Sequence, residues 1–149
     1  MLIEIAKLAD IQNIAKLDTH IPKERLTECV RLGHVYVLKD DSACTPPENA
    51  PIVGTLRYSL FWQTIPFLDL LYISRAFRRM GHGTEMMRTW EEAMKKRGYE
   101  YVMTSTQADE DAWAFYEKLG YRRAGGFFPP EQDAEEWIYL KKLELSDLR

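Results

Sequence analysis

The sequence predicts an α/β fold in which helices pack against a mixed sheet. Segments with the apolar spacing of strands or of helices follow one another in the order β-α-α-β-β-β-α-β-α-β-β. This mixture of elements favours helices layered on a sheet of mixed strand direction. The chain has 149 residues, of which 46% are hydrophobic and 29% charged, and this is enough to build one sizeable core. We therefore expect residues 1–149 to form a single domain.

The first half of the chain predicts two helices between strands. Asp10 is a candidate N-cap, because its carboxylate can accept from the free N–H groups at a helix start. Pro22 fits the first turn of a second helix, and Gly33 fits its end. The expected strands cover residues 2–6, 34–39 and 52–61, and the expected helices cover residues 11–17 and 22–32. The core side of the second helix is expected to carry Leu26, Cys29, Val30 and Leu32.

The second half alternates strands with two further helices. A polar, proline-rich loop over residues 40–51 joins closely spaced apolar strands, so it is expected to be a hairpin connection. Gly98 and Gly120 each follow an apolar-periodic segment, as glycines that end helices do. Gly54 follows the β-branched Val53 near the start of the strand 52–61, and it is either a glycine with a role there or a simple bulge without function. The expected strands are 67–73, 99–106, 121–128 and 136–143, and the expected helices are 83–97 and 109–119.

The overall composition excludes several classes of protein. A net charge of −3 argues against nucleic-acid binding. No apolar run reaches the roughly 18–20 residues of a membrane helix, and the N-terminal residues lack the pattern of a signal peptide. Cys29 and Cys44 lack metal-like spacing and indicate a reducing compartment, and His20, His34 and His82 are scattered. We expect a cytoplasmic protein without a metal site that binds neither nucleic acid nor membranes.

The segment Arg78–Thr84 lies between an apolar strand and a helix and has the composition of a phosphate-binding turn. Its glycines let the backbone come close to a ligand, and the helix that follows offers unpaired N–H donors and a partial positive charge. Two arginines add full charges. A glycine-rich helix start without a ligand would have the same composition, so the segment alone leaves both interpretations open.

Its spacing excludes two common phosphate loops. The dinucleotide motif G-x-G-x-x-G would need a third glycine where Met86 stands, and the chain contains no Gly-Lys-Ser/Thr for a P-loop. The pattern [Q/R]-x-x-G-x-[G/A] does match, at Arg78, Gly81 and Gly83. This resembles the acyl-CoA pyrophosphate loop of the GCN5-related N-acetyltransferase (GNAT) superfamily.

A second motif follows about thirty residues later. Phe115-Tyr116 and the later pair Gly120-Tyr121 resemble the superfamily's late helix and strand, in which the tyrosine stands beside the thioester sulfur. Phe115 is expected to be a core aromatic. The two motifs in this order are more specific than either alone, and the predicted order of elements matches the superfamily throughout. The resemblance is good over residues 51–143 and rests on pattern alone over residues 1–39.

The resemblance implies a GNAT-like acyl-CoA N-acyltransferase fold and an N-acetyltransferase. Such an enzyme moves an acetyl group from acetyl-CoA to a primary amine by direct attack, the amine being a small molecule or a peptide N-terminus. Tyr116 is the candidate general acid, because a phenol can protonate the departing thiolate. The residues implied in CoA binding are Leu71, Tyr72, Ile73, Arg78, Arg79, Met80, Gly81, His82, Gly83, Thr84, Asp109 and Tyr116.

The general base is less clear from the resemblance. Thr104 stands where the ribosomal-protein alanine acetyltransferases carry a glutamate, and a threonine cannot act as a base. Asp69 lies within an apolar strand, where burial would raise its pKa, and it shares a face with Leu71 and Ile73. It is therefore the second catalytic candidate, as a base or as a partner of the substrate ammonium. A purely structural, hydrogen-bonded aspartate is the alternative.

Two further features concern the ligands. Asp109 stands where relatives carry an asparagine near the CoA arm; an aspartate there could still cap the helix. The segments 125–137 and 61–63 resemble the acceptor side of the family, although the first could equally be a solvated hairpin. A non-catalytic acyl-CoA sensor is the alternative function, and a homodimer is the assembly that the resemblance suggests. The acceptor amine is not decoded by the sequence.

Overall fold

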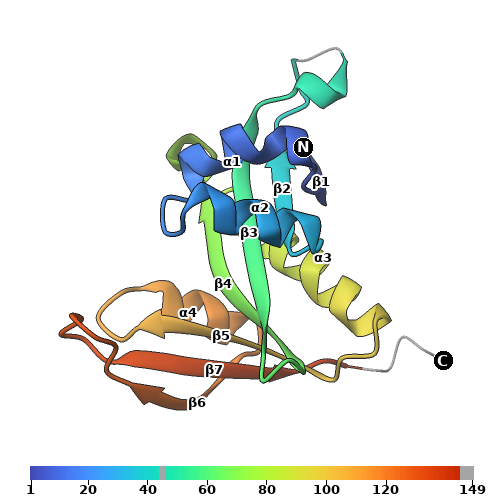
Figure 1. The fold of residues 1–149 in the computed structure, drawn as a ribbon. Helices are drawn as coiled ribbons and strands as arrows, with labels where there is room; N and C mark the ends of the chain where they lie inside the picture. The colour runs from blue at the N-terminus through green and yellow to red at the C-terminus, as the bar shows by residue number, and fades with distance from the viewer. Residues whose placement is uncertain (44–45, 145–149) are drawn as a thin grey trace. The chain divides into compact units, whose positions relative to one another are not determined.

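The computed structural model describes residues 1–43 and 46–144, and the chain divides into two compact units. The first unit contains residues 1–59 and 69–90, and the second contains residues 60–68 and the chain from Glu91 onward. The described elements follow the expected order, which confirms the predicted α/β class with a mixed sheet (Figure 1). A single domain over the whole chain stays a prediction.

The strands are β1 (Leu2–Ile5), β2 (Val35–Lys39), β3 (Ile52–Phe61), β4 (Ile65–Ile73), β5 (Tyr101–Gln107), β6 (Arg122–Phe127) and β7 (Glu136–Lys142). The helices are α1 (Ile11–Leu17), α2 (Lys23–Arg31), α3 (His82–Lys96) and α4 (Ala112–Lys118), with short 3₁₀ helices η1 (Leu8–Asp10), η2 (Pro47–Asn49) and η3 (Arg75–Phe77). None of the helices in the described part of the chain is long and apolar enough to cross a membrane.

Several element boundaries differ from the prediction. β4 begins at Ile65, before the predicted start at Phe67, and includes Pro66; a proline is tolerated near the first residue of a strand. α4 begins at Ala112, not at Asp109, because the intervening residues form a turn. Apolar periodicity locates an element but says little about its first and last residues.

The strands are hydrogen-bonded in the order β1-β2-β3-β4-β5-β7-β6. β1 with β2 and β2 with β3 are antiparallel in the first unit, and β7 is antiparallel to both β5 and β6 in the second. The second unit also contains the parallel register of β4 with β5, which pairs Phe67 with Met103 and Leu68 with Thr104. The predicted mixture of strand directions is therefore present.

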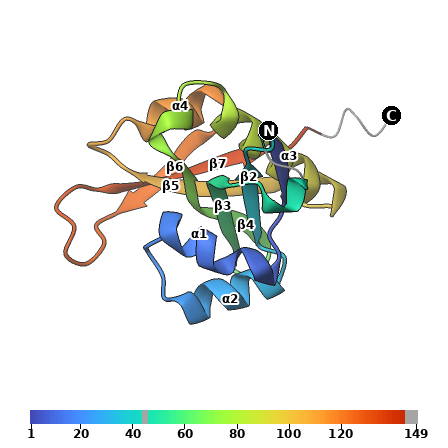
Figure 2. The same cartoon turned by 90° about the horizontal axis from the view of Figure 1, so that it is seen from above.

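Helices cover both faces of the sheet in the first unit. α1 and α2 lie side by side on one face, and the start of α3 lies on the other (Figures 1 and 2). Because alternate residues of a strand point to opposite faces, Arg57 of β3 reaches Asp18 at the end of α1, whereas Tyr58 packs on Trp90 of α3 with ring centres 5.6 Å apart.

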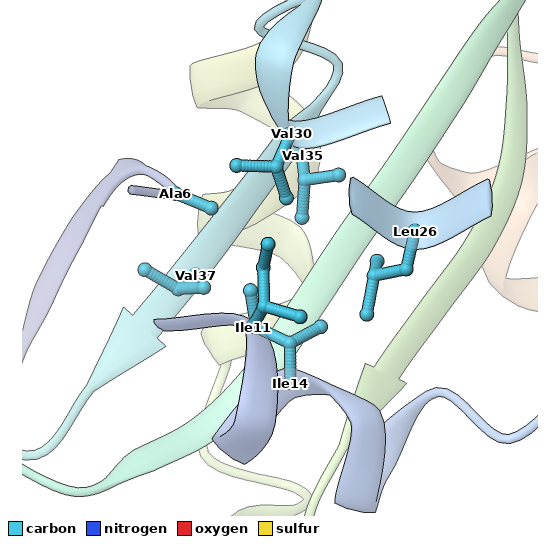
Figure 3. Close-up of a cluster of buried hydrophobic side chains, with 7 residues drawn as sticks. All are labelled: Ala6, Ile11, Ile14, Leu26, Val30, Val35 and Val37. Atoms are coloured by element: carbon cyan, nitrogen blue, oxygen red, sulfur yellow. The ribbon is translucent and has the colours of Figure 1, made fainter. Parts of the chain in front are cut away.

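An aliphatic cluster fastens α1 and α2 to the first unit. Its side chains point toward one another from β2, the two helices and the turn after β1 (Figure 3). Burial of such a valine, leucine or isoleucine contributes about 1.5–3 kcal/mol. Leu32 does not join it as predicted: it follows the last turn of α2 and is 66% exposed. The cluster consists of Ala6, Ile11, Ile14, Leu26, Val30, Val35 and Val37.

Asp10 occupies the N-cap position of α1, as predicted, but its side chain makes no capping hydrogen bond to this helix. Its carboxylate instead accepts from the backbone N–H of Lys7 at 2.9 Å and pairs with the ammonium of Lys39 at 3.3 Å. The Lys39 side chain is only 3% exposed and also pairs with Glu4 at 2.9 Å. A buried ammonium must be paired, so Asp10 is held by a charge on β2.

A carboxylate also organises the second unit. Glu91 accepts from the hydroxyl of Tyr121 and from the ammonium of Lys141, each at 2.7 Å. Tyr121 is 2% exposed, and its hydroxyl therefore needs such a partner. These bonds join the C-terminal part of α3 to the beginning of β6 and to β7.

Candidate active site

The predicted pyrophosphate segment is a tight turn between β4 and α3 in the first unit. The chain leaves β4, forms η3, extends at Arg78 and then turns through Arg79 and Gly81, whose φ angles are +62° and +85°. A left-handed conformation suits glycine and costs about 1–2 kcal/mol at a residue such as arginine. α3 begins at His82, so Gly83 lies inside its first turn. Gly81 alone supplies the conformational freedom that the motif requires here.

The start of α3 offers backbone donors to an anion. The N–H of Glu85 donates to the carbonyl of Gly81 at 3.0 Å, and the amides of His82, Gly83 and Thr84 precede this bond in the chain. Amides in the first turn have no acceptor within the helix, and the helix dipole adds a partial positive charge there. α3 has 15 residues, so its N-terminus has the geometry that phosphate groups use in other proteins.

Arg78 has a structural role that the motif does not predict. Its Nε donates to the carbonyl oxygen of Ile73 at 2.7 Å, and its guanidinium carbon lies 5.3 Å from the ring centre of Tyr72. The N–H of Ser74 donates to the carbonyl of Val53 at 2.8 Å. The turn is therefore fastened to the ends of both β4 and β3, and Arg78 is oriented by β4 itself.

Gly54 explains how β3 and β4 approach each other beneath this turn. A Cβ atom on Gly54 would lie 2.9 Å from Cδ1 of Ile73, 3.2 Å from Cβ of Leu38 and 3.2 Å from the carbonyl oxygen of Tyr72. The register of β2 with β3 also shifts beside it, where Leu38 pairs with Gly54 and Lys39 with Ile52. Gly54 is therefore both at a bulge and at a close approach. The β4 positions Leu71, Tyr72 and Ile73 are all partly exposed.

Asp69 belongs to a charged cluster that the sequence does not reveal. Arg57 donates from Nε to Asp18 at 2.7 Å, and its Nη1 lies 3.7 Å from Oδ2 of Asp69. The side chain of Asp18 is fully buried, that of Arg57 is 9% exposed, and that of Asp69 is 26% exposed. Two carboxylates thus share one guanidinium, and only Asp69 reaches solvent.

The environment of Asp69 favours its protonated form more than water does. Burial raises the pKa of Asp69, whereas a hydrogen bond from Ser59 and the charge of Arg57 oppose the rise and Asp18 adds to it. A carboxylate with a raised pKa is a better proton acceptor than an ordinary aspartate. The signal that could have pointed to the cluster is Arg57, the one charged residue of β3.

Tyr116 lies in α4 of the second unit and is 8% exposed. Burial raises the pKa of Tyr116 to about 12, and its hydroxyl shares a hydrogen bond with Thr104 of β5. The hydroxyl of Thr104 in turn donates to the carbonyl of Leu68 at 3.2 Å. The rings of Phe115 and Tyr121 lie 5.2 and 5.8 Å from that of Tyr116. The phenol is therefore protonated at neutral pH, as a general acid must be.

Asp109 lies in the turn before α4, and its carboxylate accepts from Nε2 of Gln107 at 3.4 Å. The residue at the N-cap of α4 is Asp111, which makes no capping hydrogen bond with its side chain. Asp109 therefore does not cap this helix, although an aspartate can do so, because the helix begins later. A contact between Asp109 and CoA stays a prediction.

Glu135 of the β6–β7 hairpin is engaged within it. Glu135 accepts from Nε1 of Trp137 at 3.1 Å and from Arg123 at 3.4 Å, and the guanidinium of Arg123 lies 4.1 Å from the Trp137 ring centre. Two large side chains of the predicted acceptor segments are exposed. Phe128 is 67% exposed, and Trp62 of the β3–β4 turn is 79% exposed. The role of both segments in binding an acceptor stays a prediction.

The predicted residues are thus divided between the two units. The first unit brings together the β4 positions, the turn at Arg78–Thr84 and Asp69, and the second contains Asp109 and Tyr116. The sequence analysis missed the partners of the two catalytic candidates, which are Asp18 and Arg57 for Asp69 and the Thr104 hydroxyl for Tyr116.

Comparison with known proteins identifies similar folds. The fold is similar to that of the ribosomal-protein-S18-alanine N-acetyltransferase from Escherichia coli, with a TM-score of 0.78, 13% identity and coverage of 97% of this chain and 94% of that one. The fold is also similar to that of the NatC complex bound to Gag peptide and CoA. The TM-score is 0.79, the identity is 15%, and the match covers 96% of this chain and 98% of that one.

A third similar structure is N-acetylglutamate synthase from Neisseria gonorrhoeae, complexed with coenzyme A and N-acetyl-glutamate, with a TM-score of 0.76, 15% identity and coverage of 96% of this chain and 35% of that one. A comparison with curated protein sequences finds no match. The sequence profile of the acetyltransferase (GNAT) family matches residues 4–121. The chain therefore belongs to the acetyltransferase (GNAT) family.

Proposed function

We propose that this protein is an N-acetyltransferase that moves the acetyl group of acetyl-CoA to a primary amine by direct attack. The observation that carries the proposal is the turn at Arg78–Thr84, in which Gly81 adopts a positive φ and α3 begins with its first amides beside two arginines. In a chain of this family, that turn is suited to the pyrophosphate of CoA.

In the proposed complex the amides from Arg79 to Thr84 bind the pyrophosphate. Backbone groups of Leu71, Tyr72 and Ile73 bind the pantetheine arm and the carbonyl oxygen of the thioester. The carbonyl of Ile73 already accepts from Arg78, so the pantetheine arm would use the other polar groups of this stretch. Two of the similar structures contain CoA, which supports the choice of cofactor.

The proposed reaction needs a base, an oxyanion donor and an acid. An alkyl amine has a pKa near ~10 and must lose a proton before it attacks the thioester carbonyl. Asp69 is the proposed acceptor of that proton, directly or through water. The attack forms the amide and breaks the carbon–sulfur bond, and Tyr116 gives its phenolic proton to the departing thiolate.

Direct attack is favoured over an acyl-enzyme because the described cysteine is a poor nucleophile. Cys29 is partly buried in α2 and packs against the aliphatic cluster of the first unit. Burial raises the pKa of the Cys29 thiol, which lowers the fraction of reactive thiolate. Cys44, the other cysteine, lies outside the described residues.

The acceptor is proposed to carry an ammonium group. The cluster of Asp18, Arg57 and Asp69 contains two carboxylates and one guanidinium, and Asp69 is its exposed member. The similar structures include one bound to a peptide and one bound to an acetylated amino acid, so both acceptor classes remain in the proposal. A cytoplasmic location and a homodimer also stay predictions.

Calorimetric titration with acetyl-CoA, CoA, ATP and NAD tests the cofactor, and a thiol-release assay with a panel of amines and peptides tests the reaction. We expect binding of acetyl-CoA and CoA only, and thiol release with at least one ammonium-bearing acceptor. Binding without release for any acceptor would favour the non-catalytic sensor.

Tyr116→Phe tests the acid. We expect kcat to fall by about 10²–10⁴, the usual contribution of general acid catalysis, with little change in the affinity for acetyl-CoA. Tyr101→Phe is the matched control, because Tyr101 is 37% exposed on β5 and should not affect the rate. Unchanged thiol release in Tyr116→Phe would exclude Tyr116 as the acid.

A further inference from the structure

Two buried hydroxyl groups are joined in the second unit. Tyr116 is 8% exposed and Thr104 is 1% exposed, and a hydrogen bond links their side chains. The hydroxyl of Thr104 also donates to the carbonyl oxygen of Leu68 at 3.2 Å. The backbone holds this geometry firmly, because Leu68 and Thr104 are register partners in the parallel pair β4–β5.

The direction of these bonds follows from counting protons. A threonine hydroxyl carries one proton and two lone pairs. Because the Thr104 hydroxyl uses its single proton to donate to the carbonyl oxygen of Leu68, it must accept a hydrogen bond from the phenol of Tyr116. In the protonated state the hydrogen bonds therefore run from Tyr116 to Thr104 and from Thr104 to the carbonyl of Leu68.

Loss of the phenolic proton changes the direction of the hydrogen bond between Tyr116 and Thr104. A phenolate has no proton to give and, in a buried position, requires a donor. Rotation of the Thr104 hydroxyl would turn its proton from Leu68 to the phenolate oxygen. Hydrogen bonds to a charged group are stronger than those between neutral groups, so the exchange favours the phenolate. The hydrogen bond from Thr104 accordingly acts to lower the pKa of Tyr116, against the larger rise caused by burial.

We propose that Thr104 is a positioning residue whose hydroxyl first orients the phenol of Tyr116 and then donates to the phenolate once Tyr116 has protonated the leaving thiolate. This rests on the proposed role of Tyr116 as the acid. In the step the proton of Tyr116 moves to sulfur, the Thr104 proton stays on its own oxygen, and the bond to Leu68 is given up. Thr104 touches neither substrate in this scheme and acts only through Tyr116.

The other groups near Tyr116 do not supply this donor. The Phe115 ring is apolar, and the Tyr121 hydroxyl already donates to Glu91. The Glu91 carboxylate is paired with Lys141 as well. Among the residues described around Tyr116, the hydroxyl of Thr104 is thus the group with which its phenol shares a hydrogen bond.

A matched pair of variants isolates the hydroxyl. Thr104→Val keeps the branched shape and removes the hydroxyl, and Thr104→Ser keeps the hydroxyl and removes the methyl group. 3-Fluorotyrosine is incorporated throughout the full chain, its resonance at Tyr116 is assigned by loss in Tyr116→Phe, and the pKa is followed by ¹⁹F NMR. Fluorine lowers the phenol pKa, which moves the titration to a less alkaline range.

We expect the pKa of Tyr116 to rise by about one unit in Thr104→Val, the size of one hydrogen bond to a charged group, and to stay near the wild-type value in Thr104→Ser. The kcat for thiol release should fall about tenfold in Thr104→Val, with an unchanged KM for acetyl-CoA, and should recover in Thr104→Ser. Thr104→Ala replaces the valine variant in the same comparison if Thr104→Val does not fold.

The two readouts separate the inference from the proposed function. An unchanged or lowered pKa of Tyr116 in the variant without the hydroxyl overturns the role of Thr104, whatever the activity. A loss of rate that Thr104→Ser does not recover also overturns it, because the shape and not the hydroxyl would then matter. Unaltered thiol release in Tyr116→Phe instead overturns the acid role of Tyr116.

Discussion

Gly54→Ala tests whether the close approach of β3 to β4 supports the end of β4 on which the CoA site is proposed to depend. The new methyl carbon would lie 2.9 Å from Cδ1 of Ile73, 3.2 Å from Cβ of Leu38 and 3.2 Å from the carbonyl oxygen of Tyr72. The first neighbour is the end of a side chain and can rotate away. The other two are fixed to the backbone, so β4 or β2 must move by a few tenths of an ångström.

The magnitude follows from two opposed effects. Overpacking of this kind costs about 1–3 kcal/mol. Replacing glycine by alanine reduces the entropy of the unfolded chain, and this stabilises the folded protein by about 0.4–1 kcal/mol. We therefore expect a net loss of about 1–2 kcal/mol in the free energy of unfolding, which corresponds to a fall in Tm of roughly 3–6 °C for a chain of this length.

Urea and thermal unfolding of the apo protein measure the loss, and calorimetry measures the affinity for acetyl-CoA. Gly125→Ala is the matched control, because a Cβ at Gly125 would meet nothing within 4 Å. It should be about 0.4–1 kcal/mol more stable than the wild type, because only the entropy effect on the unfolded chain remains. A displaced Tyr72 carbonyl should also weaken acetyl-CoA binding in Gly54→Ala but not in the control.

Equal stability of Gly54→Ala and Gly125→Ala would refute the reasoning, since it would mean that the strands relax around the methyl group without cost. A loss of stability with unchanged affinity for acetyl-CoA would leave the packing argument intact. It would show instead that the end of β4 does not take part in binding CoA.

Three further predictions concern the same molecule. Asp69→Asn should flatten the acidic side of the kcat/KM profile, because a base with a raised pKa is lost as the pH falls through that pKa; an unchanged profile would remove Asp69 as the base. Arg78→Met should raise the Kd for acetyl-CoA about tenfold at low salt by removing a charge and the bond to Ile73, and equal affinities at low salt would contradict this. Ile14→Ala, at a fully buried position, should lower the free energy of unfolding by about 2–5 kcal/mol in urea titrations, and a change below 1 kcal/mol would place Ile14 outside the core.

The order of elements could be predicted because it depends on local periodicity. Strands and helices each impose a fixed repeat on their apolar residues, and β3, for example, was expected with the bounds that the structure has. The turn at Gly81 could be predicted for a similar reason, since glycine is the residue that adopts a positive φ most readily. Both inferences use residues that are near one another in the chain.

Capping and burial at particular residues were predicted less well. Asp10 lies at the N-cap of α1 as expected, but its carboxylate pairs with Lys39 of β2 and makes no capping hydrogen bond to the helix. The helix α4 was expected to begin at Asp109, but it begins at Ala112. Leu32 has an apolar side chain, yet α2 ends before the position at which it would face the core. In each case the outcome depended on a partner or an end point that periodicity does not specify.

The sequence by itself determined the family and the position of the proposed CoA turn, because the two motifs are short and their residues act through the local backbone. Only the tertiary structure decided the surroundings of the two catalytic candidates. Asp18 and Arg57 are 39 residues apart in the chain, and Thr104 and Leu68 are 36 apart. Hydrogen bonds between such distant residues exist only after the strands have paired and the helices have packed. They therefore leave no local pattern in the sequence. The same packing buries Asp69 and Tyr116, and this burial raises the pKa of both groups.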